Sequence, residues 1–295
     1  MKYIIGIDSG ATSSEAVLYP LGNGRKIIKK YPSVNISVLG IDEASKRLMN
    51  IVNDISKKPG IGNITTVAAG ISGVRYEKDR KKLERAVKKT TGIKKVTVLP
   101  DTEAAFASAF ESNEKNCGIL IAGTGSILYY RDKHGKLLKT GGWGRHIGDE
   151  GSGYWIAREA LYKVTKYYDG RHKKTMLADI LKKEFGIDSV NIVKHVYHKG
   201  FEISQLTKHV FRCAERGDRA SIEIIKYAAE NLLTHFVPLK NRVCRIALMG
   251  SLFTEEMLLA KYLRKLAREK FYNIELIKPK LKPVWGAVKI ALLNS

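Results

Sequence analysis

The sequence predicts an α/β protein of two lobes with a central cleft and with helical insertions in the second lobe. The main observation is a repeat: three strands, a helix, a strand, a helix and a strand occur twice along the chain. A second observation is length, since 295 residues are enough for two medium-sized lobes. A third is a long helical stretch that interrupts only the second repeat. We place the ligand site in the cleft, where the strands' carboxyl ends meet.

The first repeat opens with three short strands joined by hairpin-like turns. Its apolar runs are short and β-branched, which is typical of buried strands. Leu83 and Val87 mark the single apolar stripe of a strongly basic helix. The predicted strands are residues 3–8, 15–19, 26–31, 65–71 and 95–99, and the helices are residues 42–57, the basic segment between 78 and 95, and 102–111.

The second repeat follows the same order, with helices inserted up to about residue 240. One amphipathic stripe marks that insertion, formed by Ile222, Ile225, Ala229, Leu232 and Phe236. The predicted strands are residues 117–122, 127–131, 136–139, 245–249 and 273–277, and later helices are residues 255–270 and 284–293. We expect the last helix to pack on the first lobe, so that lobe comprises residues 1–103 and 280–295, and the second comprises 104–279.

Composition limits the classes of protein to consider. The formal charge of +23 attracts polyanions such as a nucleotide triphosphate, an anionic membrane or nucleic acid. There is no apolar run of 18 residues, and the short apolar N-terminus lacks a signal-peptide cleavage site, which predicts a cytoplasmic protein without a membrane span. Abundant Lys, Arg, Glu and Ile, with Gln205 as the only glutamine, indicate a thermophilic origin.

The cysteines and histidines give no local metal motif. Cys117, Cys213 and Cys244 are far apart, which argues against both a zinc site and a disulfide framework. His195 and His198 have helical spacing, but a solvated helix face explains them better than a metal site.

The most informative segment is the glycine-rich stretch at residues 141–155. Clustered glycines allow positive φ angles and close approach of the backbone to a ligand. Within it, Asp149 can accept hydrogen bonds from hydroxyl groups and Trp143 can offer a flat apolar face. A plain flexible loop is the alternative.

Two short turns carry glycine and hydroxyl residues directly after predicted strands. Backbone N–H groups in such turns can hold phosphate oxygens, and Asp8 could bind Mg²⁺ through water. Ordinary hairpin turns remain the alternative, but two equivalent turns could grip one polyphosphate from both sides. The candidate residues are Asp8, Ser9, Gly10, Ala11 and Thr12 in the first turn, and Gly123, Thr124, Gly125 and Ser126 in the second.

Two further strand ends carry candidate functional residues. Asp101 lies where a strand ends and a helix begins. It is either the N-cap of that helix or a general base at the floor of the cleft. Gly250 and Ser251 join a strand to a helix, and a purine or ribose could approach the backbone there. The alternative is an ordinary glycine turn that binds no ligand.

These segments, in this order, resemble the actin–hexokinase–heat-shock-protein ATPase superfamily over nearly the whole chain. Within it, the chain is similar to N-acetylglucosamine kinases and archaeal hexokinases, a group shared with activators of 2-hydroxyacyl-CoA dehydratases and benzoyl-CoA reductases. The resemblance implies two actin-like (ribonuclease H-like) lobes. In the first phosphate motif, which usually carries consecutive glycines and a lysine, Ala11 and Ser13 stand at those positions, and Gly250-Ser251 replaces the usual Gly-Gly.

The resemblance also implies roles for individual residues. Asp101 is implied as the base that deprotonates a sugar hydroxyl, and Asn35 as a sugar contact. Nucleotide contacts are implied for Thr124, Gly125 and Gly250. The implied sugar pocket is lined by Gly142, Trp143, Asp149 and Gly153.

The expected function is that of an ATP-dependent sugar kinase. It would use ATP and Mg²⁺ to phosphorylate a hexose or N-acetylhexosamine such as glucose, glucosamine or N-acetylglucosamine, at O6. A homodimer is expected and nucleic acid is not expected as a partner. Two alternatives are an iron–sulfur ATPase that activates a CoA-ester dehydratase or reductase, which would need exposed cysteines, and a non-catalytic nucleotide- or sugar-sensing module.

Overall fold

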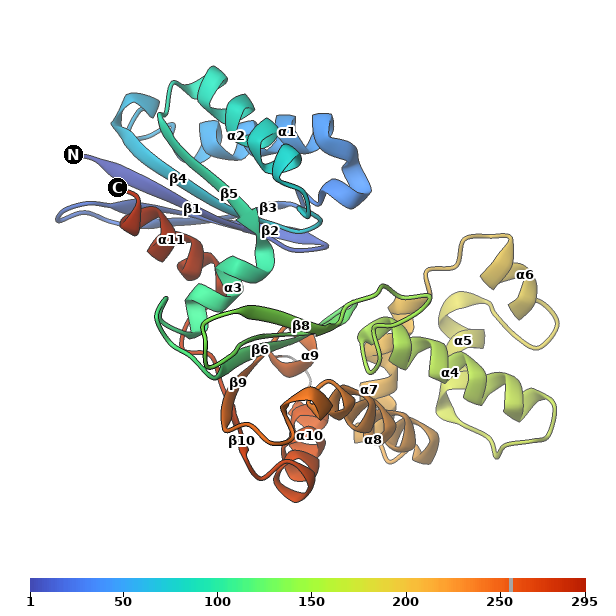
Figure 1. The fold of residues 1–295 in the computed structure, drawn as a ribbon. Coiled ribbons are helices and arrows are strands. Elements are labelled where there is room, and N and C mark those ends of the chain that lie inside the picture. Colours follow the sequence, from blue (N-terminus) through green and yellow to red (C-terminus); the bar gives the residue numbers. More distant parts are fainter. Residues whose placement is uncertain (255–256) are drawn as a thin grey trace. The chain divides into compact units, whose positions relative to one another are not determined.

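The computed structural model describes residues 1–254 and 257–295 and divides the chain into two compact units. The first unit comprises residues 1–114 and 279–295, and the second comprises residues 115–278. Each unit contains one five-stranded mixed sheet with helices (Figure 1). The α/β class and the repeated strand order are therefore confirmed. In the described part of the chain, no helix is long and apolar enough to cross a membrane.

The sheet of the first unit has the order β3-β2-β1-β4-β5. β1 is antiparallel to β2 and parallel to β4, which in turn is parallel to β5. The carboxyl ends of β1, β4 and β5 therefore meet at one edge of the sheet. The strands are β1 (Tyr3–Ser9), β2 (Ser13–Pro20), β3 (Ile27–Pro32), β4 (Ile64–Ile71) and β5 (Lys95–Pro100).

Helices cover both faces of this sheet. On one face, buried side chains of α1 and α2 pack on alternate residues of β1 and β2, and on the other face Val284 and Val288 of α11 pack on Ile4 and Val17. The last helix of the chain therefore packs on the sheet of the first unit. The helices are α1 (Ile36–Ile55), α2 (Glu77–Thr91), α3 (Asp101–Ala109) and α11 (Pro283–Leu293), and a short 3-10 turn, η1, spans Ile61–Asn63.

Helix α1 begins earlier than the predicted residue 42. Asn35 caps it, since its Oδ1 accepts a hydrogen bond from the backbone N–H of Ser37 at 2.9 Å. Gly40 interrupts the helical geometry with φ 71° and ψ 165°, so the sequence pattern is regular only after it.

The sheet of the second unit repeats the plan with the order β10-β9-β6-β7-β8. Again the first strand of the repeat, β6, is antiparallel to the next, β7, and parallel to β9. The strands are β6 (Cys117–Ala122), β7 (Ser126–Arg131), β8 (Leu137–Gly141), β9 (Cys244–Met249) and β10 (Ile274–Ile277).

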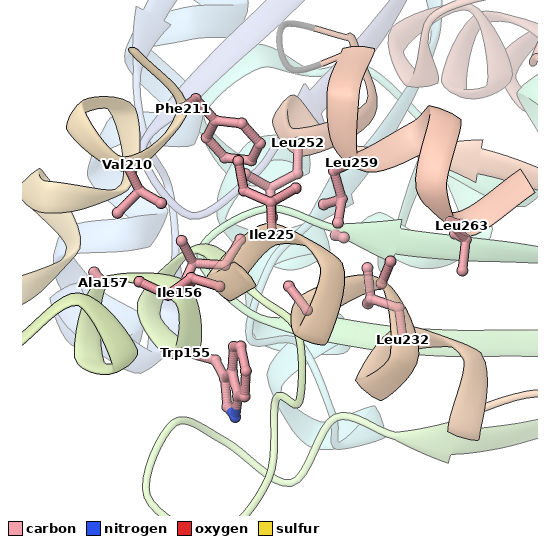
Figure 2. Close-up of a cluster of buried hydrophobic side chains, with 14 of the residues drawn as sticks. Trp155, Ile156, Ala157, Val210, Phe211, Ile225, Leu232, Leu252, Leu259 and Leu263 are labelled. Carbon is pink, nitrogen blue, oxygen red and sulfur yellow. The ribbon is translucent and has the colours of Figure 1, made fainter. Parts of the chain in front are cut away.

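One large hydrophobic core joins this second sheet to its helices. Trp155 and Ile156 of α4, Ile225 of α8 and Leu259 of α10 lie within it (Figure 2). Of the predicted helix at residues 255–270, Glu255 and Glu256 lie outside the described residues. The helices are α4 (Gly153–Tyr168), α5 (Met176–Phe185), α6 (Ile192–Tyr197), α7 (Thr207–Glu215), α8 (Arg219–Thr234), α9 (Ser251–Thr254) and α10 (Met257–Lys270), with 3-10 turns η2 (Ile203–Leu206) and η3 (Val237–Leu239).

Candidate functional site

Two carboxylates of the first unit stand at the carboxyl ends of β1 and β5, the two parallel strands on either side of β4. Asp8 of β1 pairs in register with Gly70 of β4, and Asp101 opens α3 directly after β5. A Cβ atom built on Gly70 would lie 2.7 Å from Cβ of Ala104 and 3.3 Å from Cα of Asp101. The absence of a side chain at Gly70 thus lets the start of α3 lie directly against β4.

Burial raises the pKa of both carboxyl groups, and nearby negative charges raise that of Asp8 further. The pKa of Asp8 rises to about 7, first because the group is desolvated and then because of the negative charges of Asp101 and Glu15. Burial also raises the pKa of Asp101, although hydrogen bonds from Thr102 and Ser72 act in the opposite direction. This environment favours proton uptake and cation binding.

Asp101 is the first residue of α3 and not its N-cap, which is Pro100. Its Oδ1 accepts a hydrogen bond from the backbone N–H of Thr102 at 2.9 Å. The side chain of Ser72 also bonds to this carboxylate. Both contacts orient the carboxylate, so the first-turn position and a role as a base are compatible.

Ser72 links this carboxylate to two other predicted site segments. Its backbone N–H donates to the carbonyl of Ser9 at 2.8 Å, and its carbonyl accepts from the N–H of Ile36 at 3.2 Å. The sequence reasoning missed Ser72 because it lies just beyond a strand end without a recognisable motif.

The turn after β1 is a tight hairpin between Ser9 and Ser13. The backbone N–H of Gly10 donates to the carbonyl of Ser13 at 3.0 Å, and the hydroxyl of Ser33 donates to the carbonyl of Gly10 at 2.7 Å. Ala11 and Thr12 are exposed at its tip. The backbone at the tip therefore faces solvent, where a ligand could reach it.

Ser9 is the exception among the residues predicted in this turn, because it is fully buried. Its Oγ accepts hydrogen bonds from the hydroxyl of Ser14 at 2.9 Å and from the N–H of Val34 at 2.8 Å. The side chain of Ser9 thus holds the turn to the segment before α1 and is not exposed to a ligand.

Asn35 is half-buried at the start of α1 and next to the loop after β4. A Cβ atom on Gly73 would lie 2.8 Å from its Oδ1, and Gly73 has φ +83°, so this position requires glycine. Oδ1 caps the helix, while the described chain contains no acceptor for the Nδ2 group. Asn35 can therefore donate to a hydroxyl group of a ligand.

In the second unit, the turn between β6 and β7 is tied to the start of α4. The N–H of Gly123 donates to the carbonyl of Gly125 at 2.9 Å, and the N–H of Gly153 donates to the carbonyl of Gly123 at 2.7 Å. Thr124 is exposed, whereas Ser126 is buried and its hydroxyl donates to the carbonyl of Glu150 at 2.8 Å. Ser126, like Ser9, supports its turn from inside.

Asp149 closes the glycine-rich loop onto this turn. It is a non-glycine residue at φ 58°, and its Oδ2 lies 2.8 Å from the position of a Cβ atom on Gly125. Backbone N–H groups of Ser126 and Gly144 bond to its carboxylate, whose pKa burial raises. A residue held in this strained conformation has a fixed orientation.

Trp143 lies on the same loop and is 65% exposed, with the Lys139 Nζ 4.8 Å from its ring centre. Gly142, with φ +70°, has no room for a Cβ atom because the side chain of Ile127 occupies that place. Trp155, by contrast, is 6% exposed and belongs to the core. Only the first tryptophan of the stretch can therefore offer its face to a ligand.

The second unit contains a cavity of about 300 Å³ beside the β6–β7 turn. It brings together predicted residues of the turn, the start of α4 and the start of α9. The four lining residues from η2 and the start of α7 were missed because no motif marks these two segments, and Leu252 of α9 was not predicted either. The lining is Gly123, Thr124, Gly153, Ser204, Gln205, Thr207, Lys208, Ser251 and Leu252.

Gly250 allows the chain to turn beside this cavity. It has φ +98°, and a Cβ atom there would overlap the carbonyl of Ala122 at the end of β6. This position therefore requires glycine on both conformational and steric grounds.

The cysteines and the potential metal ligands form no site of their own. The three cysteines are buried. Among residues 1–254 and 257–295, no three or more His, Cys, Asp or Glu side chains are placed together to hold a metal ion.

Comparisons with known proteins find relatives that match nearly the whole chain. The sequence model of the BadF/BadG/BcrA/BcrD ATPase family matches residues 5–291. A Clostridium acetobutylicum protein named N-acetylmuramic acid/N-acetylglucosamine kinase is 30% identical over 307 residues, covering 99% of this chain and 98% of the relative. A Dictyostelium discoideum protein named N-acetyl-D-glucosamine kinase is 26% identical over 317 residues, covering 99% and 98%.

Among solved structures, a Chromobacterium violaceum protein provisionally named N-acetylglucosamine kinase has the same fold. Its TM-score is 0.79 at 21% identity, with 99% of each chain covered.

Proposed function

The chain belongs to the BadF/BadG/BcrA/BcrD ATPase family, and on this basis we propose that it phosphorylates an N-acetylated amino sugar with ATP. It is an ATP-dependent sugar kinase. The observation that carries the chemical assignment is the half-buried carboxylate of Asp101, oriented by Thr102 and Ser72 at the carboxyl end of the sheet. A raised pKa suits a general base because it increases the group's affinity for the proton it must take.

In this proposal Asp101 removes the proton from the attacking sugar hydroxyl. The hydroxyl oxygen forms a bond to the γ-phosphorus of ATP while the bond to the bridging oxygen breaks, and ADP leaves. Nδ2 of Asn35 donates to another hydroxyl of the same sugar, since its Oδ1 is used by the helix. We propose O6 as the phosphorylated position.

In the second unit we assign further sugar contacts to residues around the glycine-rich loop. Asp149 has a fixed carboxylate that can accept from hydroxyl groups, and Trp143 exposes an apolar face of the kind that sugar rings pack on. We assign Gly142 and Gly153 to the lining of the same sugar pocket, although protein atoms already fill the place of a side chain at both positions.

We assign the adenosine of ATP to the cavity beside the β6–β7 turn. Thr124, Ser251 and Ser204 supply hydroxyl groups there, and Lys208 supplies a positive charge. Backbone groups of Gly123 and Gly125, together with the exposed tip at Gly10, Ala11 and Thr12, are assigned to phosphate oxygens. Gly250 allows the turn that opens the cavity.

Asp8 is the residue we assign to Mg²⁺, through water. A carboxylate whose pKa is raised by burial and by neighbouring negative charges gains from a nearby cation, which would favour its ionised form. Mg²⁺ commonly uses one or two carboxylates together with the phosphates of its nucleotide. When bound, the ion would neutralise charge on the β- and γ-phosphates.

The iron–sulfur alternative finds no support in the cysteines. Cys117, Cys213 and Cys244 are 0%, 1% and 3% exposed, whereas a cluster shared between subunits needs accessible thiolates. Burial also raises the pKa of each thiol, which disfavours the thiolate form.

The test is ADP release with MgATP and a panel of sugars. The panel is glucose, glucosamine, mannose, N-acetylglucosamine and N-acetylmuramic acid, the last two because the relative at 30% identity is named for both. We expect sugar-dependent ADP release, fastest with an N-acetylated sugar. ADP release that no sugar stimulates would refute the proposal.

We further propose a cytoplasmic homodimer of thermophilic origin that does not use nucleic acid as a partner. Light scattering during size-exclusion chromatography measures the mass of the assembly. Thermal unfolding tests the thermophilic assignment, and salt-sensitive DNA binding at physiological ionic strength would contradict the last point.

A further inference from the structure

His235 is a buried imidazole at the C-terminal end of α8 that the proposed chemistry does not use. The residue is 2% exposed. Its Nδ1 lies 3.2 Å from the carbonyl oxygen of Leu232, and because a carbonyl can only accept, Nδ1 carries the hydrogen. Nε2 is then a bare acceptor, and it is buried without a hydrogen-bond partner in the described chain.

The unpartnered Nε2 is aimed at the start of the glycine-rich loop. A Cβ atom built on Gly141 would overlap Nε2 of His235 and lie 2.7 Å from its Cδ2, so only glycine fits above the imidazole. Gly141 ends β8 with φ +74°, and Gly142 and Trp143 follow it.

The other end of the loop rests on the same helix. A Cβ atom built on Gly151 would lie 2.5 Å from the carbonyl oxygen of Ala228 and 2.6 Å from Cγ of Leu232, and Leu232 belongs to the core shown in Figure 2. Both ends of the loop thus contact the last turns of α8, with His235 beneath one of them. A buried acceptor without a donor is unfavourable, so a donor that reached Nε2 would hold the loop more firmly on α8.

The charges around His235 come from the loop itself. Glu150 and Asp149 act on the imidazole and favour its protonated form, but burial outweighs them and lowers the pKa of His235. The ring is therefore neutral near pH 7 and keeps Nε2 as an acceptor.

We propose that His235 is a positioning residue for the loop of residues 141–151, and that its Nε2 accepts a backbone N–H of this loop when sugar binds. The inference rests on the proposed function, because the loop carries the sugar contacts assigned to Trp143 and Asp149. It adds a residue outside the ligand pocket that determines how well the loop is held around the sugar.

Two substitutions separate this role from a purely structural one. His235→Asn keeps an N–H near the carbonyl of Leu232 and removes the acceptor at the position of Nε2. His235→Gln places an amide oxygen near that position. Loss of one hydrogen bond to the bound loop predicts that H235N raises the KM for sugar about tenfold, with kcat and the KM for MgATP changed less than about twofold. H235Q should restore most of the sugar affinity.

A measurement on the wild-type protein covers the case in which the variants fold poorly. The ¹⁵N chemical shift of His235 Nε2 should move in the direction of hydrogen-bond acceptance when sugar is added, and amide exchange in residues 141–151 should slow. An unchanged Nε2 shift in sugar-saturated enzyme would overturn the inference, as would wild-type kinetics in folded H235N.

The two proposals fail in different ways. If the wild-type protein shows no sugar-dependent ADP release, the proposed function fails and this inference falls with it. If the wild-type enzyme is active but either the Nε2 shift or the KM of folded H235N is unaffected, only the role of His235 is wrong.

Discussion

Replacing Asp8 by asparagine should stabilise the folded protein at alkaline pH while impairing phosphoryl transfer. Burial, Asp101 and Glu15 raise the pKa of Asp8 from 3.8 to about 7. Above pH 7 the folded protein holds an unfavourable negative charge that the unfolded chain solvates freely. Asparagine has nearly the same shape without the charge, so it removes this cost.

The size of the effect follows from the displaced pKa. Each pH unit between the two pKa values corresponds to about 1.4 kcal/mol, so the charge costs up to about 4 kcal/mol at pH 8. Asp8 is only half-buried, and solvent screening reduces the expected gain in D8N to about 2 kcal/mol.

The direction of the pKa shift of Asp8 determines the pH range in which D8N and the wild type differ in stability. Because the folded pKa of Asp8 is the higher one, its contribution to stability is fully present below pH 3.8 and is lost as the pH rises through 7. The advantage of D8N should therefore be full at pH 8, shrink steadily on acidification and be small at about pH 4.

Urea unfolding of both proteins across this pH range is the assay, and Asp54→Asn is the matched control. Lys29, Lys57 and Tyr31 hydrogen-bond to Asp54 and lower its pKa, so D54N should lose stability at neutral pH, the opposite sign to D8N. If the free energies of unfolding of wild type and D8N run parallel from pH 4 to pH 8, Asp8 titrates normally and the reasoning is wrong.

Three further predictions concern the reaction and the turn beside the cavity. Asp101→Asn should lower kcat, measured by ADP release, by about a thousandfold. The sugar dissociation constant, measured by titration, should change less than about threefold. Near-normal turnover would contradict the assignment of Asp101 as the base. In the wild-type enzyme, kcat/KM for MgATP should fall as the pH drops through about 7, where Asp8 takes up a proton, and a flat profile from about pH 6 to pH 8 would oppose this. Gly250→Ala should lower the free energy of unfolding by about 2 kcal/mol or more, because φ is +98° and a Cβ atom would overlap a backbone carbonyl of β6. The control is Gly170→Ala, which should cost about 1 kcal/mol because φ is +80° but the space around the residue is open. Equal losses of stability in the two variants would contradict the steric argument.

The sequence determined the elements and the turns of this protein because those depend on neighbouring residues. Alternating and continuous apolar runs define both five-stranded sheets, and the repeated order of strands predicts their common topology. Glycine marks the places where the backbone needs a positive φ, as at Gly142 and Gly250. The start of α1 escaped this reading because Gly40 breaks the periodicity just after the cap at Asn35.

Tertiary structure decided which candidate side chains are available to a ligand and how they titrate. Ser9 and Ser126 fit the phosphate motifs, yet both hydroxyls are used inside the protein. The cavity residues Ser204 and Lys208 carry no motif and reach the glycine turn only through the packing of η2 and α7. Burial, electrostatic coupling and the shape of a cavity depend on segments that are distant in sequence, so local patterns hold little information about them.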